Sequence, residues 1–213
     1  DDSAARKMPG IKDIFTIKSL TDDYERQNFD TCTFTELVVV AGNTTWEVLN
    51  AKKALKVEWE PFGDYNEIRK SAGGSQTKRV PAGLESTTDH LSKMAAMSTK
   101  PGNVLRKDGE PEKAFKDAAR IIERTYTAPF LAHNCMEPMN FFFFFFAEKA
   151  DLAGPLQKPE FTEKTLSARL GLPLDKIDIQ MTRLGGGFGR RSYAHWLVEA
   201  ALISQKMNAP VKL

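Results

Sequence analysis

The apolar positions of the first part of the chain predict a strand, a helix and a second strand. Residues 36–42 form a β-branched run that ends at a glycine, as in a buried strand. The hydroxyl of Thr44 or Thr45 can cap a following helix by accepting a hydrogen bond from an unpaired amide. Apolar residues within 48–55 lie on one helical stripe. Apolar and charged residues then alternate over 56–60, which favours another strand.

Glycines and prolines divide the middle of the chain. Residues 61–83 contain several of both, with basic residues between them and no sustained period, so we expect a long connecting loop. A helical pattern resumes over 85–97. The break at Pro101–Gly102 suggests a boundary between a domain of residues 1–104 and one of residues 105–213.

The second half alternates helical and strand patterns, so the fold class is mixed α/β (α+β). Helices are expected over 111–118, 162–170 and 193–207, and a strand over 177–181. Six consecutive phenylalanines, Phe141–Phe146, indicate a central strand with both faces buried, since an exposed run would be prone to aggregation. A slot for an apolar ligand is the alternative for this run.

Composition narrows the functional classes. The formal net charge is +2 and 41% of the residues are hydrophobic, so the chain resembles an ordinary globular domain without a broad surface for nucleic acid or anionic membranes. We find neither a membrane-spanning apolar run nor a secretory leader pattern. Cys32 and Cys135 match no zinc spacing and no disulfide-rich scaffold. Because no Met precedes Asp1, we expect an internal piece of a longer protein.

The segment RLGGGFGRRS, residues 183–192, is the most informative one. It lies between an expected strand and an expected helix, and four of the five positions 185–189 are glycine. Glycines let a ligand approach the backbone, and consecutive amides ahead of a helix form a nest for an anion. Arg190 and Arg191 add positive charge. The segment therefore predicts a cradle for phosphate or another oxyanion.

Two common glycine-rich nucleotide motifs do not match this segment. A phosphate-binding P-loop needs a Lys-Ser/Thr pair after the last glycine, and that pair is missing. The dinucleotide fingerprint G-x-G-x-x-G fails because its third glycine would fall on Arg190 or Ser192. A glycine-rich turn without any ligand stays open as an alternative.

Two further features bear on chemistry. In an extended chain His133, Cys135 and Glu137 would share one face, yet three mixed ligands without a fourth make a poor metal site, so we expect no metal bound directly by side chains. The isolated His90 and His195 are expected to be structural or surface residues.

Gln157 follows Gly154-Pro155 at the end of an expected strand. Its side-chain amide can donate to a ligand oxygen while it accepts a hydrogen bond elsewhere. By itself this signal is weak. It gains weight only if Gln157 and the glycine cradle converge in space.

Together, the sequence MEP at 136–138, Gln157, the LGLP that ends a helix, and GGGFGRR resemble the molybdenum-binding large subunit of the xanthine oxidase family. MEPMN and GGGFGRR are most similar to the isoquinoline 1-oxidoreductase beta-subunit branch, which includes related aldehyde dehydrogenases. Upstream residues resemble the latter part of that family's hammerhead domain. The resemblance runs through nearly the whole chain.

The resemblance implies a molybdopterin cofactor, in some members the cytosine dinucleotide form, whose dithiolene holds molybdenum without protein ligands. It implies that Gln157 donates to an oxo ligand and that backbone around Gly186, Gly187, Phe188 and Gly189, with Arg190, contacts the cofactor. The family's glutamate base lies far downstream, so no catalytic residue is expected in this chain. Electrons would pass to [2Fe-2S] clusters in a small partner subunit.

The resemblance thus predicts a fragment of a bacterial molybdenum hydroxylase that oxidises an N-heterocycle or an aldehyde with water as oxygen donor, and that is inactive by itself. Relatives often continue GGFG with Gly-Lys-Glu, whereas Arg190, Arg191 and Ser192 stand at these positions, which argues against purine-type substrates. The alternative is a non-catalytic module that binds phosphate or a nucleotide through the glycine loop. The compartment, periplasm or cytoplasm, stays open.

Overall fold

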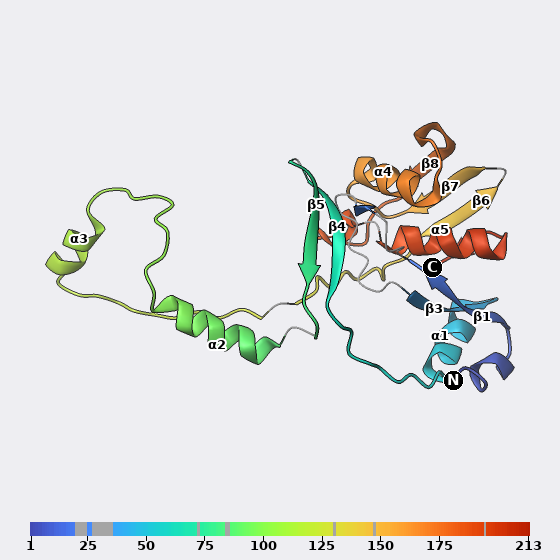
Figure 1. The fold of residues 1–213 in the computed structure, drawn as a ribbon, viewed down its shortest axis with the longest axis horizontal. Coiled ribbons are helices and arrows are strands. Elements are labelled where there is room, and N and C mark those ends of the chain that lie inside the picture. Colours follow the sequence, from blue (N-terminus) through green and yellow to red (C-terminus); the bar gives the residue numbers. More distant parts are fainter. Residues whose placement is uncertain are drawn as a thin grey trace. The chain divides into compact units, whose positions relative to one another are not determined.

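The computed structural model covers the 213-residue chain and divides it into two compact units (Figure 1). One unit contains Asp1–Ala82 and Ala132–Leu213, and the other contains Gly83–Leu131. The residues that the structure describes are 1–19, 25–26, 36–71, 73–83, 86–129, 131–146, 148–193 and 195–213.

The first unit begins with a two-stranded antiparallel sheet and a helix. Strand β1 (Ile11–Lys18) pairs with β3 (Glu36–Gly42), and α1 (Thr45–Lys53) follows, while a 3-10 turn, Ala5–Lys7, precedes β1. Thr44 caps α1, because its hydroxyl accepts a hydrogen bond from the Glu47 amide at 3.3 Å. The strand over 36–42 and the cap of the next helix are therefore as predicted.

Two predictions for the next segment are wrong. Residues 56–60 belong to no strand, although their alternation favoured one. The expected loop over 61–83 contains a hairpin instead, in which β4 (Tyr65–Ser71) pairs antiparallel with β5 (Gly74–Val80) and the short β2 (Glu25–Arg26) pairs parallel with β4. Nearly all of β5 is exposed, so the hairpin has little apolar alternation by which sequence reasoning could detect it.

A four-stranded sheet forms the rest of the first unit, in the order β8-β7-β6-β9. Its strands and helices are β6 (Phe142–Phe146), β7 (Lys149–Gly154), α4 (Pro159–Leu170), β8 (Ile177–Met181), α5 (His195–Met207) and β9 (Val211–Lys212), with 3-10 turns at Leu174–Lys176 and Arg190–Ser192. Helix α4 contacts β8, α5 contacts β6, and the two helices contact each other, so both cover the same face. Phe143, Leu152 and Leu166 are fully or almost fully buried in the core between them.

The phenylalanine run forms an interior strand of this sheet, but only one of its faces is buried. Phe143 is 0% exposed beneath the helices, whereas Phe142 and Phe146 on the opposite face are 40% and 66% exposed. The expectation that both faces are buried is wrong, because in the described residues the helices cover one side only. The outward face also carries Lys149 and Asp151, which form an ion pair at 2.7 Å.

The remaining helices of this unit end where the sequence predicts. Helix α4 stops at Gly171, whose φ of 67° is left-handed and therefore favours a residue without Cβ. Helix α5 buries Trp196, Ala200 and Ile203 along one face, as its periodicity predicts. The expected strand over 177–181 is β8.

The second unit consists of two helices and irregular chain. Helix α2 (Thr87–Ser98) is capped by Ser86, whose hydroxyl accepts from the Asp89 amide at 3.2 Å, and α3 (Pro111–Asp117) begins with its proline. Neither helix has a buried residue. Both helices agree with the sequence prediction, and neither packs a residue into a core: α2 begins after a capping serine, whereas α3 begins at a proline without a side-chain cap.

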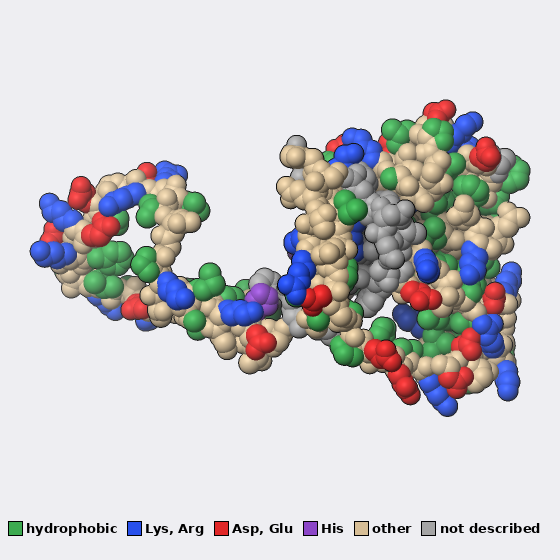
Figure 2. All heavy atoms as spheres, in the orientation of Figure 1, with side chains coloured by type: hydrophobic (Ala, Val, Ile, Leu, Met, Phe, Trp, Pro, Cys, Tyr) green, Lys and Arg blue, Asp and Glu red, His purple; other side chains and the backbone are tan. Residues whose placement is uncertain are grey.

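The whole chain confirms the mixed helix and strand class. Acidic and basic side chains are interspersed over the face seen in Figure 2, in keeping with the net charge of +2. Among the described helices, none combines the length and the apolarity that crossing a bilayer requires.

Candidate functional site

The glycine-rich segment forms an irregular loop between β8 and the 3-10 turn that precedes α5. Three of its residues take left-handed conformations: Gly186 with φ 102°, Phe188 with φ 51° and Gly189 with φ 88°. Phe188 is the unusual one, because a side chain with Cβ is strained there. Its ring is 68% exposed. The loop thus holds a bulky aromatic residue at an exposed and strained position, a feature that concentrates at functional sites.

Gln157 lies directly against this loop, so the structure brings together the two features whose convergence the sequence left open. The Gly189 backbone amide donates to the side-chain oxygen Oε1 of Gln157 at 3.1 Å. The backbone amide of Gln157 donates to the Arg191 carbonyl, also at 3.1 Å. The side chain of Gln157 is exposed, and no described residue accepts a hydrogen bond from its Nε2. That N–H₂ group can therefore donate to an external oxygen atom.

The loop approaches its neighbours so closely that two of its glycines leave no room for a side chain. A Cβ added to Gly187 would lie 2.6 Å from Cδ of Gln157, and one added to Gly185 would lie 2.4 Å from Cβ of Glu137. Real Cβ atoms do not come so near to other heavy atoms. Glycine at these positions is thus explained by close packing, whereas at Gly186 and Gly189 it is explained by the positive φ.

A second segment, residues 133–137, runs beside the loop and binds its outer side. The Cys135 thiol contacts the Gly187 carbonyl at 3.7 Å, and Arg190 Nη1 donates to the His133 carbonyl at 2.9 Å. The Cys135 side chain and the His133 backbone carbonyl therefore both contact the loop. Within the described part of the chain, no group of three or more His, Cys, Asp or Glu residues could hold a metal ion.

The residues that tie this segment to the loop are Glu137 and Arg191. Arg191 is completely buried, and its Nη2 donates to both Oε2 and the backbone carbonyl of Glu137, at 3.1 and 2.8 Å. Arg191 Nε donates to the Gly186 carbonyl at 2.7 Å. Sequence reasoning gave Arg191 only a general positive charge, and it placed Glu137 among metal-ligand candidates.

Several groups stabilise the charged form of Glu137. Oε2 accepts from the Gly185 amide at 2.8 Å, and Oε1 accepts from Asn140 at 3.1 Å. The Gly185 amide, then Asn140 and the charge of Arg191, hold the pKa of Glu137 below its usual value against the opposing effect of burial. Glu137 is consequently an anion at neutral pH, which the buried Arg191 guanidinium requires.

The arrangement provides hydrogen-bond donors for an oxygen-rich group. The amides of Gly186, Gly187 and Phe188 have no acceptor among the described residues. Arg191 Nη1 also has no partner there, but it is fully buried and does not face an external ligand. With Gln157 Nε2 and the guanidinium of Arg190 beside them, these amides suit an oxyanion or a cofactor with oxygen ligands.

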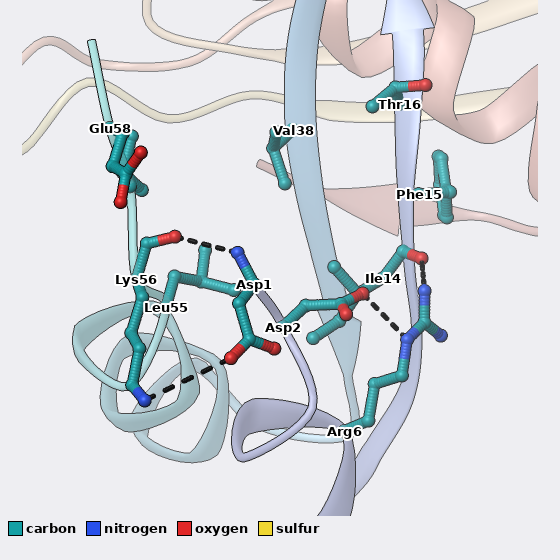
Figure 3. A pocket seen from close by; sticks show the side chains of 11 residues that line it. Asp1, Asp2, Arg6, Ile14, Phe15, Thr16, Val38, Leu55, Lys56 and Glu58 are labelled. Carbon is teal, nitrogen blue, oxygen red and sulfur yellow. Dashed lines mark hydrogen bonds and ion pairs between the residues drawn. The ribbon is translucent and has the colours of Figure 1, made fainter.

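A pocket of about 540 Å³ lies elsewhere in the first unit and shares no residue with the glycine loop (Figure 3). Its wall includes Asp1, whose amino group donates to the Lys56 carbonyl at 2.8 Å. Arg6 pairs with Asp2 across part of it, with Nε and Oδ2 2.7 Å apart. The pocket contains none of the predicted site residues.

The remaining candidates from the sequence play no part in the loop cluster. His195 stacks edge-on against Trp196 at the start of α5, with ring centroids 4.5 Å apart, and His90 belongs to α2 in the other unit. Cys32 lies outside the residues that the structure describes.

Comparison with known proteins gives the loop cluster a family context. The family model of the molybdopterin cofactor-binding domain matches residues 97–213, more than half of the chain. A membrane-bound aldehyde dehydrogenase of Gluconacetobacter polyoxogenes, whose name specifies pyrroloquinoline quinone, is 28% identical over 83% of this chain and 21% of its own length. Xanthine dehydrogenase of Dictyostelium discoideum is 27% identical over 100% of this chain and 15% of its own.

One more curated relative and one solved structure support the same family. The molybdenum-binding subunit of an aldehyde oxidoreductase from Escherichia coli O157:H7 is 30% identical over 55% of this chain and 16% of its own. Quinoline 2-oxidoreductase from Pseudomonas putida 86 shares the fold, with a TM-score of 0.61 at 15% identity over 100% of this chain and 28% of that one. The chain thus spans at most about a fifth of the length of these three curated relatives. It belongs to the molybdopterin cofactor-binding domain family, as part of a molybdenum-binding subunit of the xanthine oxidase type.

Proposed function

We propose that the chain is part of the large subunit of a molybdenum hydroxylase that oxidises an aldehyde or an N-heterocycle related to isoquinoline, with water as oxygen donor. The observation that carries this proposal is the hydrogen bond between Gln157 and Gly189, which sets a side-chain donor beside a row of unpaired amides. Relatives named as aldehyde and xanthine dehydrogenases and a structural neighbour named for quinoline support the two substrate classes.

The residues present fit the cofactor that the family implies. Gln157 Nε2, the backbone around Gly186, Gly187, Phe188 and Gly189, and Arg190 would hold its oxygen atoms. The Gly189 amide already donates to Gln157, so its part is to fix that side chain rather than to contact the cofactor. A bound molybdopterin, in its plain or cytosine dinucleotide form, would supply the two-electron redox chemistry. This chain binds and orients it and shields part of it from water.

We also propose that residues 1–104 correspond to part of a hammerhead-like domain and residues 105–213 to the beginning of the cofactor-binding domain. The family match over 97–213 supports a boundary in this region. The electron acceptor would be a small subunit with [2Fe-2S] clusters. The catalytic base would be supplied by another part of the protein, because Glu137, the carboxylate beside the loop, is already engaged by Arg191 and the Gly185 amide.

The test uses the complete protein that contains this chain, purified with its natural partners. We expect molybdenum and pterin in equal amounts, together with iron and acid-labile sulfide. With isoquinoline and benzaldehyde as substrates and ¹⁸O-labelled water as solvent, we expect label in the product, and the ratio of the two kcat/KM values identifies the preferred class. Purified protein without molybdenum or pterin would contradict the proposal.

A further inference from the structure

Carbonyl contacts on one side of the glycine loop determine where its amides point. In a trans peptide unit the C=O and the N–H point in opposite directions, and the described peptide bonds are all trans. The Gly185 carbonyl accepts from the Glu137 amide at 3.2 Å. The Gly186 amide belongs to the same peptide unit, so it points away from Glu137.

The next peptide unit is fixed by Arg191. Its Nε donates to the Gly186 carbonyl at 2.7 Å, so the Gly187 amide points away from the guanidinium. Two successive amides thus face the side opposite to the buried ion pair. They are two of the three loop amides that find no acceptor among the described residues, the third being that of Phe188.

Glu137 and Arg191, which fix the carbonyls of Gly185 and Gly186, also bond to each other. Arg191 Nη2 bonds both the carboxylate and the carbonyl of Glu137, and Glu137 Oε2 also accepts from the Gly185 amide at 2.8 Å. Loss of either side chain leaves the other one with an uncompensated charge in a largely buried place. A buried ion pair by itself adds little stability over apolar packing, so stability alone does not explain its presence beside the loop.

We propose that Glu137 and Arg191 act together as positioning residues, which hold the carbonyls of Gly185 and Gly186 on one side of the loop and thereby present the amides of Gly186 and Gly187 to the cofactor's oxygen atoms. This inference rests on the proposed function. Neither side chain needs to touch the cofactor, because both act through the loop backbone.

The test compares Glu137→Gln, which keeps the shape and removes the charge, with Arg191→Lys, which keeps the charge and loses the planar fork. Hydrogen exchange of the Gly189 amide in cofactor-free protein reports loop order, since neither side chain contacts that amide. We expect exchange about tenfold faster in both variants, and a double variant no worse than either single one. Unchanged exchange would overturn the proposal.

A second measurement addresses the cofactor itself. In complete protein loaded with cofactor, we expect both variants to retain less pterin and to show an altered molybdenum EPR signal after partial reduction. Three controls separate this effect from general destabilisation: Arg120→Lys and Glu160→Gln at exposed positions, and Leu166→Ala in the core away from the loop. If Leu166→Ala changes the EPR signal equally, the pair is only structural and the inference fails. If wild-type protein contains no molybdenum, the proposed function fails, while the exchange measurement still decides whether the pair orders the loop.

Discussion

Gln157 and Gly189 are 32 positions apart in the sequence, yet Oε1 of the glutamine accepts a hydrogen bond from the glycine amide at 3.1 Å. The bond uses the acceptor end of the side-chain amide. The donor end, Nε2, is therefore held in a fixed orientation toward solvent, where a ligand oxygen can meet it. One side chain thus both stabilises the loop and offers a donor beside it.

Substitutions at Gln157 separate these two roles. Gln157→Glu keeps an oxygen for the Gly189 amide but replaces the outward donor by an anion, so we expect intact loop order and kcat of the complete enzyme lower by about 100-fold. Gln157→Ala removes both functions and should also accelerate exchange of the Gly189 amide. Steady-state kinetics and hydrogen exchange provide the two measurements. Equal kcat for Gln157→Glu and wild type would show that the donor is not used.

Gly187→Ala tests the close approach of loop and glutamine. The new Cβ would lie 2.6 Å from Cδ of Gln157, so one of the two must move. Because Cδ lies at the far end of a flexible, exposed side chain, we expect a change in stability of less than about 1 kcal/mol, but a displaced Gln157 and a lower molybdenum content in the complete protein. Gly102→Ala is the matched control, because a Cβ there meets nothing within 4 Å. A Gly187→Ala protein with wild-type metal content would contradict the packing argument.

The two faces of the phenylalanine strand should respond differently to truncation. Phe143→Ala removes a ring that is 0% exposed and should reduce the free energy of unfolding by about 3–5 kcal/mol. Phe146→Ala, at a ring that is 66% exposed, should change it by less than about 1 kcal/mol. Urea denaturation of both variants measures the difference. Similar losses at both positions would mean that the outward face is covered too.

Glu199 on α5 predicts a specific dependence of stability on pH. Burial raises the pKa of its carboxyl to about 7. Between pH 4.5, the ordinary pKa, and about pH 7, the carboxyl therefore stays protonated in the folded state but is ionised in the unfolded state. The free energy of unfolding consequently decreases as the pH rises through this window.

Glu199→Gln should consequently stabilise the protein above pH 7, by roughly 1–3 kcal/mol, and have little effect below the ordinary carboxyl pKa. Thermal denaturation across this pH range measures the effect, and Glu160→Gln at an exposed position is the control. A stability difference that is independent of pH would show that Glu199 does not titrate in this window.

Elements with strong local signals were predictable from sequence. The β-branched run over 36–42 and the glycine that ends α4 at Gly171 each depend on neighbouring residues alone. The β4–β5 hairpin was missed because its strands are largely solvent-exposed and show no apolar period. Its register places Ser71 opposite Gly74.

The candidate site was predictable only in part, for a similar reason. Glycine clustering marks the loop directly, because few other residues tolerate its conformations. The ion pair between Arg191 and Glu137 joins residues 54 positions apart, and two charged residues so distant carry no local mark of their pairing. Sequence reasoning could place both residues near the site but could not assign their contacts.

The five phenylalanines of β6, preceded by a sixth at Phe141, have a consequence for how the strand is aligned in its sheet. Sliding β6 by a single residue would exchange its inward and outward rings without changing any residue type, so the run itself cannot encode its alignment. The alignment must come from its surroundings. The Phe145 amide donates to the hydroxyl of Ser204 at 3.1 Å, and the ring of Phe141 fills the space where a Cβ on Gly154 would stand, 2.5 Å away. A serine on α5 and a glycine on the neighbouring strand β7 thus fix the register of β6, which the phenylalanines themselves do not specify.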